Sequence, residues 1–267
     1  MPRWENGFQT SEEIQRYKRY AVIREAARIM SRRGFHNTSL DEVAKVLGIS
    51  KGTLYNYVKD KQEILFECHN IALDLGDYAA EFAREMGGHG IDQIRLWLRC
   101  YSIWMYGQAG VGGVTFDVNA LRADDRSVII ERRDAMDANL AALLEESIAD
   151  GSIRPCDAKI AVYGIMSAIN GISIWFSPNG RRSIEEVTDQ LLDLLTLSLA
   201  TRPDELAPYP QIPPYPTPET SLSFFTRTSP AGTRAAKPGE RKARSSTPRS
   251  KALTAPKRKA RSVTAKA

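Results

Sequence analysis

The strongest constraint on the fold is a helical spacing of apolar residues that continues, segment after segment, from Tyr17 to about Leu199. Within this span no run alternates apolar and polar residues with the period of two that a half-buried strand requires. Proline, which interrupts helices, is absent between residues 3 and 154. The pattern therefore predicts an all-α fold.

The composition allows a sizeable core and excludes several classes of protein. The chain has 267 residues, of which 42% are hydrophobic, and this is too apolar for a fully disordered protein. Its cysteines, at positions 68, 100 and 156, are odd in number and widely spaced, which excludes a disulfide framework and a structural zinc site. The first residues form no apolar signal sequence, so we expect a cytoplasmic protein with no cofactor and no metal.

Charge divides the chain into three parts. Residues 1–63 carry 12 basic and 8 acidic side chains, residues 64–225 carry 12 and 23, and residues 226–267 carry 13 and 1. The basic ends indicate a polyanionic partner, whereas the acidic middle does not.

Composition and periodicity together predict the domain organisation. Proline is frequent from residue 203 to 218, where we expect either a polyproline-type linker or a strap lying on the core. The expected parts are an N-terminal arm (1–16), a small helical domain (17–65), a larger helical domain (66–200), the proline-rich linker (201–225) and a disordered basic tail (226–267).

The small domain contains the pattern of a helix-turn-helix motif over residues 40–59. We expect helices at about 17–33, 40–47 and 51–58, followed by a long helix that ends near Met86. Ser39 and Glu42 form a capping box before the second helix, and a glycine-containing turn separates it from the third. In such a motif the second helix enters the major groove of DNA. The same residues also fit a three-helix core with a solvated polar face.

The start of the expected recognition helix carries side chains that suit DNA. Lys51 offers an ammonium group, Gly52 permits a close approach, and Asn56 matches an adenine edge. The hydroxyl groups of Tyr55 and Tyr57 suit phosphate oxygens.

The segment from Ser50 to Ile64, with Asp41-Glu42-Val43-Ala44 before it, resembles the signature of the tetracycline-repressor (TetR) family. The resemblance covers about residues 17–65 and departs from the family pattern only at Val58, Gln62 and Ile64. It implies an all-α homodimeric regulator with an N-terminal DNA-binding domain and a C-terminal domain that binds a ligand and the partner subunit. The DNA-contacting residues that it implies are Thr38, Leu40, Asp41, Lys51, Gly52, Thr53, Tyr55, Asn56, Tyr57 and Lys61.

An amphipathic stripe over residues 91–109 fits either plain core or the wall of a small-molecule pocket. The candidate pocket residues are Trp97, Tyr101, Trp104, Met105, Phe116, Met136, Tyr163 and Asn170. Arg132 and Arg133 fit either surface salt bridges or an anionic ligand group. Residues 150–155 and 170–180 further resemble a branch of the family that controls fatty-acid or steroid breakdown and responds to acyl-CoA thioesters. A small apolar or acyl-CoA-like effector is therefore expected.

Two apolar helices are expected at 157–176 and 183–199. The stretch from Ile160 to Gly180 carries no charge and is long enough to span a membrane, but small and polar residues interrupt it and no second span accompanies it. We therefore expect no membrane partner. In the resembled family the corresponding helices form an intersubunit bundle, which implies a dimer interface through Gly164, Ala168, Gly171, Trp175, Leu191 and Leu195. A symmetric dimer places two recognition helices in successive major grooves, about 34–36 Å apart.

The basic tail leaves two readings of function open. It resembles the Lys/Ala/Pro tails of linker-histone-like bacterial proteins, and it fits either a non-specific phosphate-binding segment or a solubilising one. The first reading is a ligand-responsive repressor that binds a palindromic operator in double-stranded DNA. The alternative is a nucleoid-associated architectural protein that acts through its tail without a ligand. An enzyme is not expected, because the adjacent Cys68 and His69 point about 100° apart on a helix.

Overall fold

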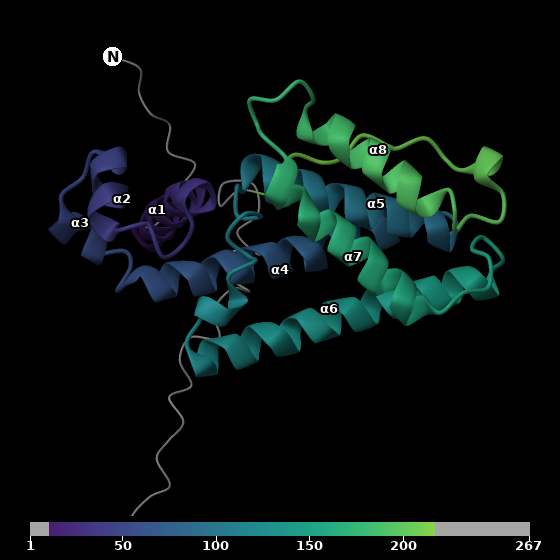
Figure 1. Cartoon of the computed structure of the whole chain (residues 1–267), viewed down its shortest axis with the longest axis horizontal. Coiled ribbons are helices and arrows are strands. Elements are labelled where there is room, and N and C mark those ends of the chain that lie inside the picture. The colour runs from purple at the N-terminus through teal and green to yellow at the C-terminus, as the bar shows by residue number, and fades with distance from the viewer. Residues whose placement is uncertain (1–10, 217–267) are drawn as a thin grey trace, which may run out of the picture. The chain divides into compact units, whose positions relative to one another are not determined.

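The computed structural model describes residues 11–216 of the chain, and these residues form helices joined by short connections (Figure 1). Within them the only β-type pairing is a single bridge between Ile153 and Ala200, so the predicted all-α fold is confirmed. The α-helices are α1 (Ser11–Arg33), α2 (Leu40–Leu47), α3 (Lys51–Tyr55), α4 (Lys61–Met86), α5 (Gly90–Ile103), α6 (Ala123–Ala149), α7 (Ala158–Trp175) and α8 (Ile184–Thr196). A π-helical turn (Trp104–Gln108) follows α5, and short 3₁₀ turns lie at Val118–Ala120 and Pro203–Glu205.

The small N-terminal unit is formed by α1, α2, α3 and the start of α4. The Ser39 side chain accepts from the Glu42 amide and the Glu42 side chain accepts from the Ser39 amide, which confirms the capping box. Gly48 ends α2 with a φ of 66°, a left-handed conformation that favours glycine. Ser50 then caps α3 by accepting from the Thr53 amide. Side-chain caps thus fix the helix-turn-helix locally.

Two expected boundaries differ from the structure. Helix α1 begins at Ser11, so residues 11–16 are helical and do not belong to an arm; Glu12 and Glu13 lie in its first turn, where acidic side chains are favourable. Helix α3 ends at Tyr55, three residues earlier than expected. Asp60 caps the start of α4, so residues 56–60 form the connection between the two helices.

The larger unit is built around α4 and α5. Helix α5 packs against both α4 and α8, while α6 packs on α4 and α5, and α7 contacts α6 and α8 (Figure 1). The core side chains Leu98, Trp104, Met105 and Leu140 are almost completely buried. Because α4 begins in the small unit and ends in the larger one, a single helix connects the two.

The proline-rich segment lies on this core as a strap, which decides between the two alternatives for residues 203–216. Three of its backbone carbonyl groups accept hydrogen bonds from α5 and the turn after it. The Ala207 carbonyl accepts from the Arg95 side chain, the Pro210 carbonyl from the Arg99 side chain, and the Pro213 carbonyl from the Trp104 indole. Tyr215 is buried, and its hydroxyl contacts that of Tyr20 on α1. The strap therefore runs from the larger unit to the first helix. The expected tail, residues 226–267, lies outside the described residues.

Candidate nucleic-acid interface and ligand cavity

The start of α3 presents an open, polar surface. Lys51, Gly52, Tyr55 and Asn56 are exposed, and Tyr55 retains 47% of its accessible surface. A side-chain carbon added at Gly52 would meet only the Ser50 hydroxyl, at an ordinary 3.8 Å. The packing of the chain itself therefore does not require this glycine, and its small size leaves room for an external surface to approach the helix start.

Lys51 is paired with Asp41 on the preceding helix. Its ammonium lies 2.7 Å from the Asp41 carboxylate, and this hydrogen bond raises the pKa of Lys51. The pair is exposed, so solvent screens it. Asp41 thus orients the Lys51 side chain at the turn between α2 and α3. Because it pairs with Lys51, the acidic Asp41 is compatible with a surface that otherwise suits phosphate.

Two of the residues expected to contact DNA have side chains that bond within the chain. Thr38 is buried, and its hydroxyl donates to the Gly34 carbonyl oxygen at 3.0 Å, so its side chain is not available to DNA. The Lys61 ammonium donates to the carbonyl oxygens of Phe35 at 2.7 Å, Thr38 at 3.0 Å and His36 at 3.3 Å. Lys61 therefore holds the connection between α1 and α2, and its expected contact with a phosphate stays a prediction.

The other expected contacts are partly or fully accessible. Leu40, Thr53 and Tyr57 are half-buried, and the Thr53 hydroxyl shares a hydrogen bond of 2.8 Å with that of Ser50. The structure thus gathers the accessible candidates around the turn between α2 and α3.

The start of α4 is tied to both units by side chains that the sequence did not single out. Arg19 on α1 donates to Glu63 at 2.9 Å and to Glu67 at 2.8 Å. Arg122, immediately before α6, pairs with Asp60 at 2.5 Å, and the Gln62 amide donates to the Ala120 carbonyl oxygen at 2.7 Å. These contacts join the start of α4 to α1 on one side and to the segment before α6 on the other.

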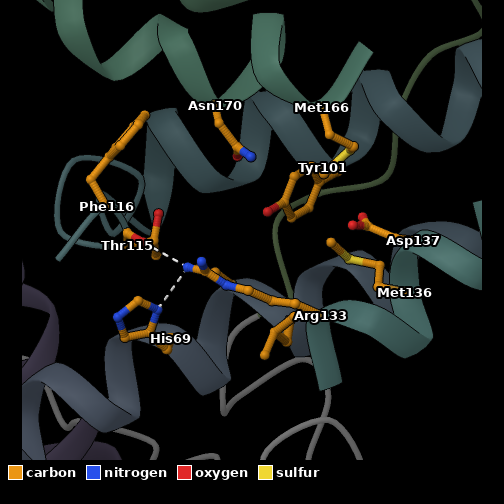
Figure 2. A pocket seen from close by; sticks show the side chains of 11 residues that line it. His69, Tyr101, Thr115, Phe116, Arg133, Met136, Asp137, Met166 and Asn170 are labelled. Carbon is orange, nitrogen blue, oxygen red and sulfur yellow. Dashed lines mark hydrogen bonds between the residues drawn. The ribbon is translucent and has the colours of Figure 1, made fainter. Parts of the chain in front are cut away.

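A cavity of about 220 Å³ lies between α4, α5, α6 and α7 (Figure 2). Its walls mix apolar side chains with a few convergent polar groups, which is the usual construction of a small-molecule site. The lining residues are His69, Ala72, Leu73, Tyr101, Thr115, Phe116, Arg133, Met136, Asp137, Met166 and Asn170.

Half of the expected pocket residues line this cavity, namely Tyr101, Phe116, Met136 and Asn170. The other half do not, and this corrects the prediction. Trp97 and Met105 are buried in the core, Trp104 is buried beneath the strap, and Tyr163 is 50% exposed on the outer surface of α7. The helical stripe identified buried residues, but it did not distinguish the side chains that border the cavity from those that fill the core around it.

The polar group at the centre of the cavity is the Arg133 guanidinium (Figure 2). Its Nη2 atom donates to the Thr115 carbonyl oxygen at 2.6 Å and to His69 Nδ1 at 3.1 Å. Burial, and then the neighbouring Arg133 charge, lower the pKa of His69 to about 3, so the imidazole is neutral. Since Nδ1 accepts from Arg133, the imidazole hydrogen lies on Nε2, which has no hydrogen-bond partner among residues 11–216.

The neighbouring Arg132 has a different role, which is the salt-bridge role expected from the sequence. It pairs with Asp74 at 2.7 Å and with Asp77 at 3.1 Å. Arg133 lines the cavity, which is the second of the two alternatives that the sequence left open for it. His69 is a cavity residue that the sequence did not single out, although a histidine among the mainly apolar residues of α4 was an available signal.

A second apolar surface lies on the outer side of α7 and α8. Ile174 is 78% exposed and Leu194 is 76% exposed. A side-chain carbon added at Gly164 or Gly171 would meet no atom within 4 Å. Among the residues expected at a dimer interface, Gly164 and Trp175 are exposed and Ala168, Gly171, Leu191 and Leu195 are half-buried. We call the outer surface of α7 and α8 that includes these residues, Ile174 and Leu194 the α7–α8 face.

By length and composition α7 is the one helix within residues 11–216 that is apolar enough to cross a bilayer. A single such helix is weak evidence for a membrane span, because core helices of soluble proteins pass the same test. Val162, Ile165 and Ile169 on its inner side are buried in the core.

Comparison with known proteins identifies both units. Residues 22–68 match the family model described as bacterial regulatory proteins, tetR family, and residues 87–199 match the model described as tetracyclin repressor-like, C-terminal domain. The transcriptional repressor KstR2 of Mycolicibacterium smegmatis is 25% identical over 190 residues, which cover 67% of this chain and 88% of KstR2.

Solved structures share the fold. The TetR family regulator PfmR of Thermus thermophilus is 28% identical, with a TM-score of 0.59, over 65% of this chain and 96% of that one. The structure of AibR in complex with isovaleryl coenzyme A and operator DNA is 24% identical, with a TM-score of 0.55, over 66% of this chain and 97% of that one.

Proposed function

The chain belongs to the TetR family of DNA-binding transcriptional regulators, and from this premise we propose that it is a homodimeric repressor, released from a palindromic operator by a small molecule. The observation that carries the proposal is the capped helix-turn-helix, in which Lys51, Gly52, Tyr55 and Asn56 remain exposed at the start of α3. These residues supply the phosphate and base contacts, and the protein acts on DNA in the cytoplasm as a regulator rather than an enzyme.

The α7–α8 face forms the dimer interface in this proposal. Its support is the exposure of Ile174 and Leu194, together with the open surface over Gly164 and Gly171, where a partner helix has room to approach. An exposed apolar surface of this kind marks an interaction site in most soluble proteins. A C2 dimer built on it pairs the same face of both subunits and presents two recognition helices to one duplex.

This interface is tested by sedimentation at micromolar concentration. We expect a dimer for the native chain and a monomer for Leu194→Glu, which places a charge on the interface. The control is Val128→Glu, at a 44% exposed position of α6, and it is expected to remain dimeric. A native chain that stays monomeric would overturn the dimer.

Release of the operator proceeds through α4. This helix lines the cavity with His69, Ala72 and Leu73, and at its start it is bonded to Arg19 and Arg122. A ligand that fits the cavity better in one tilt of α4 shifts the population towards that tilt, and the spacing of the recognition helices changes with it. The complex of AibR with isovaleryl coenzyme A supports a small apolar or acyl-CoA-like effector for this chain.

The function is tested by recovering genomic fragments with the purified full-length protein and two full-length variants. The recognition variant carries Lys51→Ala and Asn56→Ala, and the tail variant has the 13 Lys and Arg residues of 226–267 replaced by Gln. We expect a shared palindrome from the native chain and the tail variant, and its loss from the recognition variant.

A second candidate, a nucleoid-associated DNA binder acting through its tail, is favoured by the 13 basic residues of 226–267. It predicts the opposite result in the same experiment. Diffuse recovery by the native chain and the recognition variant, lost only in the tail variant, would replace the repressor with this second function.

A further inference from the structure

We propose that the effector is a small monocarboxylic acid whose carboxylate pairs with Arg133 while its apolar part occupies the rest of the cavity. This inference rests on the proposed function, since it names the ligand class of the same cavity. Four observations carry it: the state of Arg133, the state of His69, the composition of the walls and the charge that the cavity can neutralise.

Arg133 is a half-buried cation without a carboxylate partner among residues 11–216. Two other arginines of the larger unit each have one: Arg95 lies 2.9 Å from Asp193, and Arg99 lies 2.6 Å from Asp189. Within residues 11–216 Arg133 forms no such ion pair, although Asp137 lies one turn further along α6 and lines the same cavity. Figure 2 shows the guanidinium extended towards His69 and Thr115, away from Asp137. A partly desolvated charge of this kind is stabilised when a ligand supplies the opposite charge.

The hydrogen bonds of Arg133 leave part of its guanidinium available. Both bonds, to the Thr115 carbonyl oxygen and to His69 Nδ1, use the same atom, Nη2. The donors on Nη1 and Nε have no partner among the described residues. A carboxylate oxygen can therefore accept a charge-assisted hydrogen bond from Nη1 or from Nε while Nη2 keeps its bonds to Thr115 and His69.

His69 provides an independent indication that the cavity is incomplete without a ligand. The residue is 1% exposed and lines the cavity, yet its Nε2 donor has no partner in the described part of the chain. Buried donors in folded proteins nearly always have an acceptor. A neutral imidazole beside Arg133 adds a donor without adding a second positive charge.

The remaining walls fix the character of the rest of the ligand. Leu73, Phe116, Met136 and Met166 supply apolar surface, and the thioether side chains adapt to irregular shapes. Arg133 is the one cationic side chain among the lining residues, because His69 is neutral, and Asp137 lies on the same wall. The cavity therefore suits at most one negative charge, placed at Arg133, on an apolar body. A coenzyme A thioester carries its charges on phosphates, and its acyl end brings no anion to Arg133.

The experiment titrates the full-length protein with matched ligands. The probes are hexanoate and 4-phenylbutyrate, their neutral primary amides, and hexanoyl coenzyme A, with binding followed by calorimetry and release by fluorescence anisotropy of the recovered palindrome. We expect both carboxylates to bind at least 10-fold more tightly than their amides and to release the DNA. Equal binding of acid and amide would overturn the inference.

Variants assign this preference to one side chain. Arg133→Met should weaken carboxylate binding by about 10- to 100-fold, as expected for loss of a charge-assisted hydrogen bond, and leave amide binding unchanged. Arg126→Met is the matched control, because it makes the same change on α6 at a residue that does not line the cavity, and it should bind like the native chain. If only the thioester binds, or if Arg133→Met binds carboxylates normally, the inference is wrong.

Two further readouts separate this inference from folding and from the proposed function. Arg133→Met also removes the hydrogen bonds to Thr115 and His69, so its melting temperature should fall moderately while the chain stays folded at the temperature of the titration. If it does not fold, Arg133→Lys replaces it; this variant keeps the positive charge and should bind carboxylates more tightly than their amides, by a smaller factor than the native chain does. Operator affinity without ligand tests the proposed function alone. Normal operator binding without any carboxylate response would refute the carboxylate and leave the regulator standing.

Discussion

Replacing Lys61 by methionine tests whether this residue builds the helix-turn-helix or contacts DNA. The ammonium donates to the carbonyl oxygens of Phe35 at 2.7 Å and Thr38 at 3.0 Å, both partly buried, and to the more exposed His36 carbonyl oxygen at 3.3 Å. It also lies 4.4 Å from the centre of the Phe35 ring. Methionine keeps the apolar stem and removes all of these interactions.

The expected loss of stability follows from these contacts. A hydrogen bond to a charged group contributes about 1.5–3 kcal/mol net, and water entering a half-exposed site recovers part of it. Counting the two partly buried bonds and discounting the exposed one gives a loss of about 2–3 kcal/mol in the free energy of unfolding. For a unit of this size the melting temperature should fall by about 4–10 °C.

The assay combines a thermal melt followed by circular dichroism with operator affinity measured over a range of salt concentrations. A structural role predicts a lower melting temperature and an unchanged salt slope. The matched control is Lys59→Met, two residues earlier and exposed, which should melt within about 2 °C of the native chain, since surface substitutions change stability by about 0.5 kcal/mol or less.

A phosphate contact predicts the reverse pattern for Lys61→Met. Each lost contact would lower the log–log salt slope by about 0.9, and the melting temperature would not change. That outcome would refute the structural role and restore Lys61 to the DNA-contacting residues.

Three further changes have outcomes that follow from the structure. Burial lowers the pKa of His69 to about 3 from the usual 6.5, so below pH 6.5 the unfolded state binds more protons than the folded state. The free energy of unfolding should therefore fall by about 1.4 kcal/mol for each pH unit below 6.5. Urea unfolding between pH 7 and 4.5 should show this fall in the native chain and a smaller one in His69→Gln. Tyr215→Ala removes the buried side chain at the end of the strap, beside Tyr20, and should lower the free energy of unfolding by about 3–5 kcal/mol. A melting temperature equal to that of the native chain would show that the strap does not stabilise the core. Gly76→Ala would place its new carbon 2.5 Å from the Met136 sulfur, so the flexible Met136 side chain must move within the cavity. Calorimetry should show a lower effector affinity than in the native chain, and a thermal melt should show an unchanged melting temperature.

The helix-turn-helix was predictable from sequence because its determinants are local. The capping box at Ser39 and Glu42, the left-handed Gly48 and the cap at Ser50 each act within a few residues of their own position. Helix α2 begins and ends at the expected residues. The residues of the turn that follows it fixed where α3 begins, and therefore which residues at its start are accessible. The family resemblance over residues 17–65 depends on the same local residues.

The roles of long-range side chains were not predictable in the same way. Apolar periodicity identified Trp97, Met105 and Tyr101 as one stripe, but only the packing of α5 against its neighbours decided that Tyr101 borders the cavity while the other two are buried in the core. Lys61 carries a sequence signal shared with DNA-contacting lysines, and the carbonyl groups that it bonds come from residues 23 to 26 positions away.

The sequence by itself determined the all-α class, the helix-turn-helix and the apolar helices, because periodicity and caps act over a few residues of chain. Tertiary structure alone decided that Arg133 would lie beside His69 on the cavity wall without a carboxylate partner, whereas the adjacent Arg132 would be paired with Asp74. It also decided that the strap would carry Tyr215 to Tyr20, 195 positions away in the chain. The physical reason is that burial and charge pairing depend on which helices meet, and a local pattern does not specify its partners.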